Sequence, residues 1–61
     1  MIVYVVHGDI YYDGEYFEGA FSEFDKAEQH AETLADCYDE VTIREIKLDD
    51  PTYDGDKWNV K

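Results

Sequence analysis

The stretch from Ser22 to Tyr38 is the one segment of this 61-residue chain with a clear helical pattern. Its apolar residues recur at steps of three and four, which places them on one face of a helix. Ser22 is a suitable N-cap, and Asp25 follows it by three residues, as in a variant of the capping box. The sequence therefore predicts a helix that begins at Ser22, ends near Tyr38 and buries one face. The residues on that face are Phe24, Ala27, Ala31, Leu34, Ala35 and Tyr38.

Three further segments, residues 2–12, 15–20 and 41–48, are rich in β-branched and aromatic side chains and have the composition of β-strands. We expect the first two to form a hairpin, because Asp13-Gly14 between them is a strong turn signal. The predicted order of elements is therefore β-β-α-β.

Two positions interrupt the alternation of these strands. Gly8 predicts a bulge or a twist in the first strand, because a glycine in a strand interior often marks such a site. In the third strand, the apolar residues before Arg44 have one parity and those after Glu45 have the other. Either a bulge near Arg44-Glu45 reconciles them, or this strand has two useful faces.

These elements predict an α+β fold: a three-stranded antiparallel sheet with strand order 2-1-3 and one helix packed on one face. We assign residues 1–50 to this single β-β-α-β domain. Residues 51–61 form either a C-terminal tail or a short extra strand. A chain of this length buries only about 60% of its unfolded surface, which leaves no room for a deep, walled active site.

The charge balance is the most unusual feature of the composition. Sixteen acidic residues face five basic ones, for a net charge of -11, and residues 1–40 hold a single cation, Lys26. Such a chain repels nucleic acid and anionic membranes, so we expect no direct binding to either. A basic protein surface is the natural complement. The alternative is that the acidity only keeps a small protein soluble.

The cysteine content and the hydropathy bear on location. Cys37 is the only cysteine, which excludes an intramolecular disulfide and is typical of a reducing cytosol. The apolar run Ile2–Val6 lacks a basic flank and is too short for a signal peptide or a membrane span. We therefore expect a cytoplasmic protein, located in the host cytoplasm if a phage encodes it.

No catalytic motif is present, so we expect a protein that is not an enzyme, with no catalytic residue and no cofactor. His7 and His30 are the only candidate bases with a near-neutral reference pKa, and a structural role is the more common one for a single histidine. Four aspartates crowd the C-terminal turn, but their spacing does not match a calcium-binding EF-hand loop. We therefore predict no metal site there, and a calcium-dependent module is only a third option. These aspartates are Asp49, Asp50, Asp54 and Asp56.

The outward side of the predicted helix carries Asp25, Glu28, Glu32 and Asp36, at spacings of three and four. Such residues form a line, with about 5–6 Å between neighbouring Cβ atoms. A nucleic-acid strand also presents regularly spaced negative charges. Like charges at i,i+4 cost a helix roughly 0.2–0.5 kcal/mol per pair, and few cations offset them here. We therefore expect this line, backed by carboxylates of the hairpin, to bind a partner. The predicted partner-binding residues are Asp13, Glu15, Glu18, Asp25, Glu28, Glu32 and Asp36.

Short motifs add a family resemblance. Gly19–Ser22 before the helix and Lys26–Glu28 at its start resemble the outline of small β-β-α-β domains of unknown function from bacteria and their phages, over most of residues 2–49. The layout is also similar to that of the small acidic inhibitor of host RNA polymerase from phage T7. The segments of this chain that match it are Ala31–Leu34 (AETL) and Glu40–Ile46 (EVTIREI). The resemblance implies a phage-type protein of host takeover and supplies no catalytic residue.

The leading hypothesis is a non-enzymatic interaction protein, encoded by a phage, that inhibits a host nucleic-acid enzyme or defence protein by binding its basic surface as a DNA mimic. The alternative is a small structural or regulatory module that homodimerises through its sheet, because a single helix covers only one face. For that alternative, the candidate interface residues are Val3, Val5, Tyr11 and Trp58.

Overall fold

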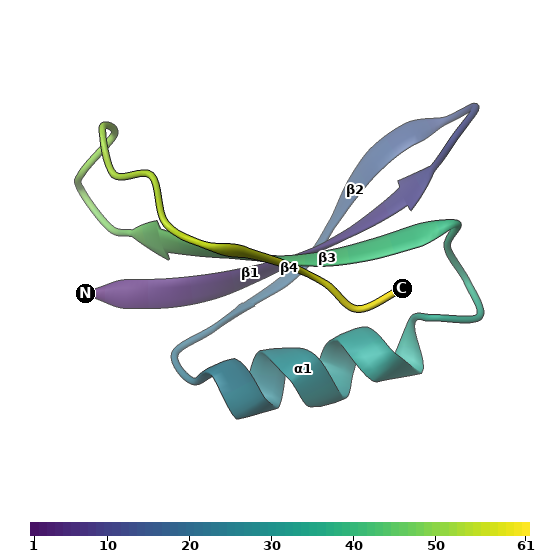
Figure 1. Cartoon of the computed structure of the whole chain (residues 1–61), viewed down its shortest axis with the longest axis horizontal. Helices are drawn as coiled ribbons and strands as arrows, with labels where there is room; N and C mark the ends of the chain where they lie inside the picture. Colours follow the sequence, from purple (N-terminus) through teal and green to yellow (C-terminus); the bar gives the residue numbers. More distant parts are fainter.

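The structure, a computed structural model, describes residues 1–61. Its elements follow the order β1 (Ile2–Ile10), β2 (Gly14–Phe21), α1 (Phe24–Thr33), β3 (Glu40–Lys47) and β4 (Lys57–Asn59). The strands form one antiparallel sheet, and α1 lies on one side of it (Figure 1). The predicted α+β class, with one helix and an antiparallel sheet, is confirmed.

The sheet has four strands in the order β2-β1-β3-β4. The predicted order 2-1-3 of the first three strands is therefore confirmed, and the prediction of only three strands is wrong. The added strand, β4, lies within residues 51–61 and pairs with β3, where Trp58 stands opposite Ile43. Beyond it, the Val60 N–H donates to the Val41 carbonyl at 2.8 Å. A three-residue strand is too short to show an alternating pattern in the sequence, which is why it could not be predicted with certainty.

The helix begins later than predicted. Its N-cap is Glu23, not Ser22, and no side chain makes a capping hydrogen bond. The ring of Phe24, the first helical residue, lies 5.6 Å from the Tyr4 ring in an edge-on arrangement and 4.7 Å from the Trp58 ring. This aromatic packing therefore decides where the first turn sits, and it overrides the capping preference of the serine.

The helix also ends at Thr33 rather than near Tyr38. The chain then winds more tightly, because the Leu34 N–H donates to the carbonyl of Ala31, only three residues back, at 3.0 Å. The tighter turns bring the chain back to the sheet, where the Asp39 N–H donates to a carbonyl of β1 at 2.9 Å.

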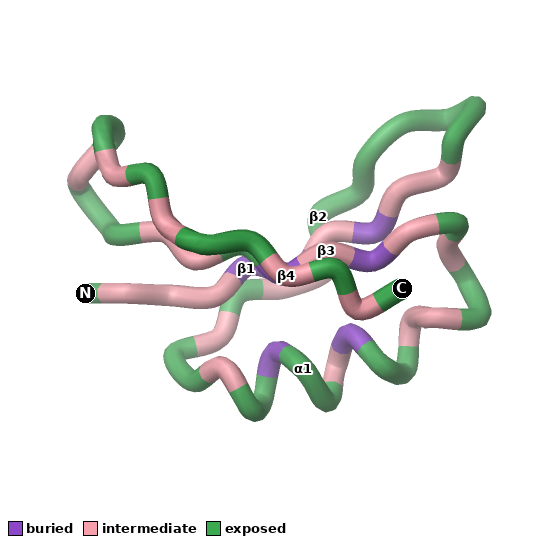
Figure 2. The backbone as a smooth tube through the Cα atoms, viewed as in Figure 1, coloured by how far each residue is buried: buried purple, intermediate pink, exposed green.

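The core lies between the inner face of α1 and the three long strands. Ala27 and Ala31 are fully buried against Val6, Val41 and Ile43, which are also fully buried (Figure 2). Alanine at these two helical positions lets the helix approach the sheet closely. Larger side chains surround this centre: Tyr4, Phe21, Phe24, Leu34, Tyr38, Trp58 and Val60. The inner face predicted for the helix is therefore confirmed at Phe24, Ala27 and Ala31. Leu34 and Tyr38 also pack on the core, but from the segment after the helix.

β1 and β3 pair without a break along their length. The bulges considered at Gly8 and near Arg44 are therefore both absent, and β3 instead has two faces. The register shifts only between β1 and β2, at Val6/His7, where Glu18 is the extra residue of β2. The turn of this hairpin spans residues 11–13, immediately before a glycine with a φ of 102°, so the predicted hairpin is present.

Gly8 provides room for an aromatic ring. A Cβ at this position would lie 2.5 Å from ring atoms of Tyr38, far inside van der Waals contact. The Tyr38 ring also lies 6.1 Å from the Tyr16 ring. The glycine is therefore needed for the close approach of the segment that follows the helix, and not for a bulge.

No helix of the structure has the length and the apolar character that crossing a membrane requires.

Replacing Trp58 with alanine should lower the free energy of unfolding by about 3 kcal/mol, the low end for Trp→Ala in a core, because the side chain keeps some exposure. Urea unfolding followed by far-UV circular dichroism measures this. The control is Tyr12→Ala, because Tyr12 is 99% exposed and should change stability by less than about 0.5 kcal/mol. Equal effects of the two variants would show that residues 57–61 are not part of the core.

Gly8→Ala should destabilise the fold by about 1–3 kcal/mol, because the new methyl group overlaps the Tyr38 ring. Thermal unfolding measures the loss. In the Tyr38→Ala background, the same change should cost much less, since the ring is gone. An equal cost in both backgrounds would show that Gly8 is needed for some other reason.

Candidate functional site

The outward side of α1 presents the carboxylates that the sequence pattern singled out. Asp25, Glu28 and Glu32, here called the helix row, are all exposed. Asp36 is exposed too, but it lies in the turns after the helix. Lys26, the only lysine of the helix, has its ammonium 3.1 Å from the carboxylate of Glu23 and makes no ion pair with the helix row. The helix row is therefore a line of uncompensated negative charge.

The three hairpin carboxylates of the predicted site do not extend this line. Asp13 lies in the turn at the tip of the hairpin, and Glu15 is on the sheet face opposite the helix. Glu18 lies toward the helix, where its backbone carbonyl is 3.0 Å from Nε2 of His30. The structure therefore brings the helix row together but distributes the hairpin carboxylates over different sides of the molecule.

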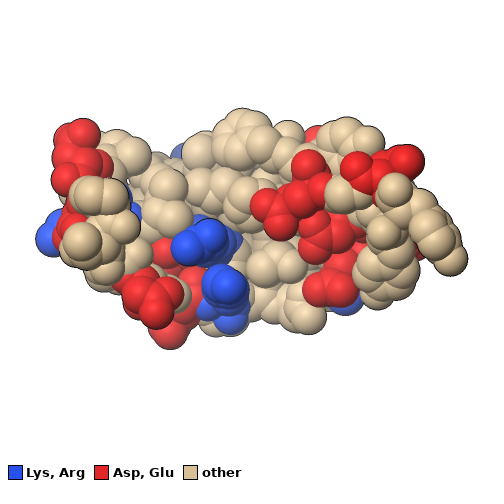
Figure 3. Space-filling view, turned by 90° about the horizontal axis from the view of Figure 1, so that it is seen from above, with Lys and Arg blue, Asp and Glu red and all other residues tan.

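The sheet face that α1 leaves uncovered, here called the open face, was not identified as a site from the sequence. Glu15, Asp9 and Glu40 are direct cross-strand neighbours on it, and we call them the acidic row. Arg44 lies four positions after Glu40 on β3 and stands directly opposite Lys57 of β4. We call these two residues the cationic pair. Figure 3 views this face, with acidic side chains toward both ends and basic side chains between them.

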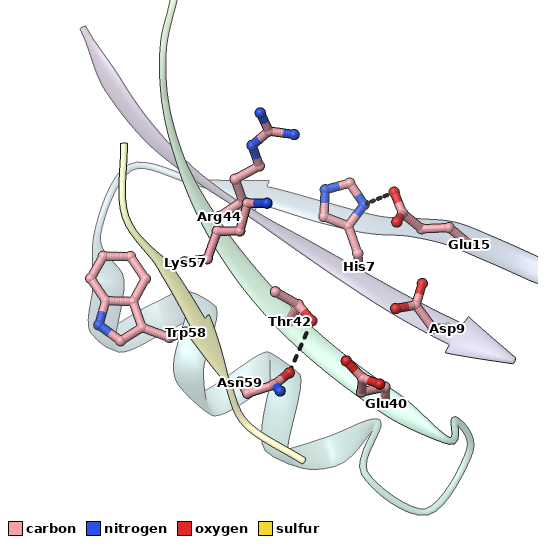
Figure 4. Close-up of a pocket in the computed structure, with 9 residues that line it drawn as sticks. All are labelled: His7, Asp9, Glu15, Glu40, Thr42, Arg44, Lys57, Trp58 and Asn59. Atoms are coloured by element: carbon pink, nitrogen blue, oxygen red, sulfur yellow. Dashed lines mark hydrogen bonds and ion pairs between the residues drawn. The ribbon is translucent and has the colours of Figure 1, made fainter. Parts of the chain in front are cut away.

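A groove of about 390 Å³ runs between these groups. Figure 4 shows His7 and Thr42 between the acidic row and the cationic pair, with the Thr42 hydroxyl donating to the Asn59 side-chain oxygen at 3.2 Å. Asp9, Glu15, Glu40, Arg44, Lys57 and Trp58 complete the lining. The lining is almost entirely polar, and its two ends carry opposite charge. This polar face could have been predicted from the sequence if β1 had been given its observed register, which has no bulge at Gly8.

The two histidines lie on opposite sides of the sheet. His7 Nδ1 lies 3.2 Å from Oε1 of Glu15. The two atoms are too poorly aligned for a hydrogen bond, and they form an ion pair only when the imidazole is protonated. The His30 ring packs on Phe21, with 5.4 Å between ring centroids. The two histidines therefore do not form a shared catalytic group.

Asp50, one of the four aspartates of the C-terminal turn, has hydrogen-bond partners within that turn. The Asp50 carboxylate accepts hydrogen bonds from the Thr52 N–H at 3.1 Å and from the Thr52 hydroxyl at 2.8 Å. The structure contains no cluster of three or more His, Cys, Asp or Glu side chains that could hold a metal ion.

The four residues proposed for an apolar dimer interface do not form one surface. Trp58 lies on the helix side, where its ring is 6.2 Å from the Tyr4 ring. Val5 is on the open face but only 7% exposed, and Tyr11 lies in the hairpin turn, 70% exposed. An apolar dimer interface on the sheet would therefore lack Trp58, the largest of the four proposed side chains.

Two tyrosines have hydroxyls in unusual surroundings. Burial and a hydrogen bond with Glu18 raise the pKa of Tyr38 above its ordinary value. The Tyr53 hydroxyl donates to the carboxylate of Glu45, and this bond, together with burial, raises the pKa of Tyr53. Both groups belong to the packing of the fold and lie outside the open face.

Alkaline pH should destabilise the protein through these tyrosines. Their pKa is higher in the folded chain than the ordinary value near 10, so the unfolded chain loses these protons first. Stability should therefore be independent of these groups below about pH 9 and fall as the pH rises through 10. Unfolding midpoints between pH 8 and pH 11 measure this. Tyr38→Phe/Tyr53→Phe should show a shallower fall; an identical fall would exclude these groups as its cause.

Comparison with known proteins gives one match. The model of a family described as a domain of unknown function, DUF7336, matches residues 1–59. No curated protein and no solved structure matches the chain.

Proposed function

We propose that this chain, which belongs to the DUF7336 family of domains, is a non-enzymatic interaction protein that binds a basic surface on a host nucleic-acid enzyme or defence protein. In this proposal a phage encodes it, it acts in the host cytoplasm, and it inhibits its target by taking the place of DNA.

The helix row is the observation that supports this proposal. Asp25, Glu28 and Glu32 are exposed, share one side of α1 and make no ion pair. The core does not use them, since the buried positions of the helix are Ala27 and Ala31. Repulsion at i,i+4 opposes the helix, so the fold alone gives no reason for the arrangement. A partner that carries lysines and arginines at similar spacing would offset it.

The electrostatics also favour a protein rather than a nucleic acid as the partner. At a net charge of -11 the chain repels phosphate backbones at long range. The same charge steers it toward basic surfaces, which are the surfaces that nucleic-acid-binding proteins present. A regular line of carboxylates on a rigid helix can occupy such a surface in competition with DNA.

The tagged chain should recover a nucleic-acid-associated protein from a bacterial lysate at low salt and lose it at high salt, because exposed charge pairs are screened. Mass spectrometry identifies the partner, and a DNA duplex should displace the chain from it. Recovery of no such protein, or binding that salt does not affect, would contradict the proposal.

A variant pair tests the role of the helix row in the same assay. Glu28→Gln/Glu32→Gln should weaken binding by roughly twofold to thirtyfold, since each exposed pair contributes about 0.2–1 kcal/mol. The matched control is Asp54→Asn/Asp56→Asn, which removes the same charge from exposed positions away from α1. Equal weakening by both variants would show that total charge, and not the helix row, governs binding.

A further inference from the structure

The open face carries charge in an arrangement that the fold itself does not favour. Glu15, Asp9 and Glu40 stand side by side across three strands, and Arg44 stands directly opposite Lys57. Like charges directly opposite each other in a sheet are destabilising. An exchange of residues between the two groups would have paired opposite charges within the chain. The observed arrangement therefore calls for a complement from outside.

The two groups do not neutralise each other within one chain. Glu40 and Arg44 lie four positions apart on β3, which corresponds to roughly 13 Å along a strand. The ion pairs of the structure, His7–Glu15 and Lys26–Glu23, include neither member of the cationic pair. Two of the five basic residues of a strongly acidic chain thus stand together without a carboxylate partner.

We propose that the open face is the contact between two copies of this chain. A two-fold axis would lie in the plane of contact and cross the strands at His7 and Thr42, which are paired midway between the two charged groups. This axis places the cationic pair of each copy over the acidic row of the other. Such a contact is isologous, so one operation satisfies both groups in both copies.

The shape of the sheet is compatible with this axis. The sheet is twisted, and the β1–β2 hairpin and the loop after β3 rise away from α1 at opposite ends (Figure 1). A regularly twisted surface coincides with itself after rotation about an axis that crosses its strands. Two such sheets pack face to face with their strands inclined by about 30°. The raised hairpin and loop of one copy then lie over those parts of the other copy's sheet that are not raised.

The contact also covers apolar surface near the axis. Phe17 pairs with His7 across β1 and β2 and is 66% exposed in the single chain. The whole molecule measures 30 by 23 by 15 Å between its outermost Cα atoms, so one face covers less than the ~800 Å² per partner of a standard interface. The net charge of each copy also opposes association. We therefore expect a weak dimer, with a dissociation constant on the order of 10–100 μM.

This inference is independent of the proposed function. Because α1 lies on the other side of the sheet, the two helix rows of a dimer would remain exposed on its outer surfaces. Loss of the dimer and loss of the basic partner are separate measurements.

Charge reversal tests the contact. One variant, Arg44→Glu/Lys57→Glu, makes the cationic pair acidic. The other, Glu15→Lys/Glu40→Lys, makes the two outer residues of the acidic row basic and leaves Asp9 between them. Sedimentation velocity at 10–500 μM, on the order of the expected dissociation constant, should show a concentration-dependent dimer for the natural chain. Each variant alone should dissociate at least about tenfold more readily, and an equimolar mixture of the two should form a heterodimer.

Two controls separate the contact from the effects of total charge. Lys26→Glu/Lys47→Glu has the same net charge as the first variant but alters exposed positions away from the open face, so it should dimerise like the natural chain. The second variant is less acidic than the natural chain, so general repulsion cannot explain its dissociation. Circular dichroism confirms that each variant is folded.

The outcomes decide the proposal. A natural chain that stays monomeric at 500 μM, the highest concentration of the series and about fivefold above the upper expected dissociation constant, overturns it. Variants that dimerise unchanged overturn it in favour of another contact surface. A mixture of the two variants that fails to associate, although each is folded, overturns the complementary arrangement of the two rows.

Discussion

The seating of one helix on one face of the sheet is the constraint on which the rest of the structure depends. Ala27 and Ala31 carry no side chain beyond Cβ, and both are fully buried against Val6, Val41 and Ile43. That close approach leaves space at the margins, which aromatic rings fill. At one end of the helix, the rings of Phe24 and Trp58 pack against the Tyr4 ring, and at the other end the Tyr38 ring covers Gly8. These rings enlarge a core whose fully buried side chains are few and small.

The same arrangement decides where the charge can go. Once a single helix has covered one face, the outer side of the helix and the opposite face of the sheet both remain in solvent. The chain uses the first for a line of carboxylates and the second for two segregated groups of opposite charge. Neither pattern contributes to the core, and both include like-charged neighbours that weaken local structure. We propose that recognition of other molecules is the physical reason for both patterns.

The sequence predicts the parts of this fold that have a period. Steps of three and four placed the inner face of the helix correctly, and the turn signal Asp13-Gly14 placed the hairpin. The helix ends were wrong because tertiary contacts fix them: Phe24 is held by rings from β1 and β4, and Tyr38 is held by Gly8. The fourth strand was left open because three residues carry no period of their own.

The charged surfaces differ in the same way: a pattern within one element can be predicted from the sequence, and a pattern that depends on strand pairing cannot. The helix row could be predicted because its spacing lies within one element. The acidic row could not, since its members come from three strands and meet only through the exact register. A presumed bulge at Gly8 would displace the alternation of β1 and hide the polar face. The cationic pair depends on β4, so it is visible only once that strand is placed.

The central claim is that the outward carboxylates serve recognition and not folding. The unfolding free energy of Glu28→Gln/Glu32→Gln at low salt tests this most directly, because it removes one i,i+4 repulsion and leaves the core intact. The account predicts a stability equal to that of the natural chain or higher by about 0.2–0.5 kcal/mol. A loss of more than about 1 kcal/mol would contradict it, since the carboxylates would then be supporting the fold.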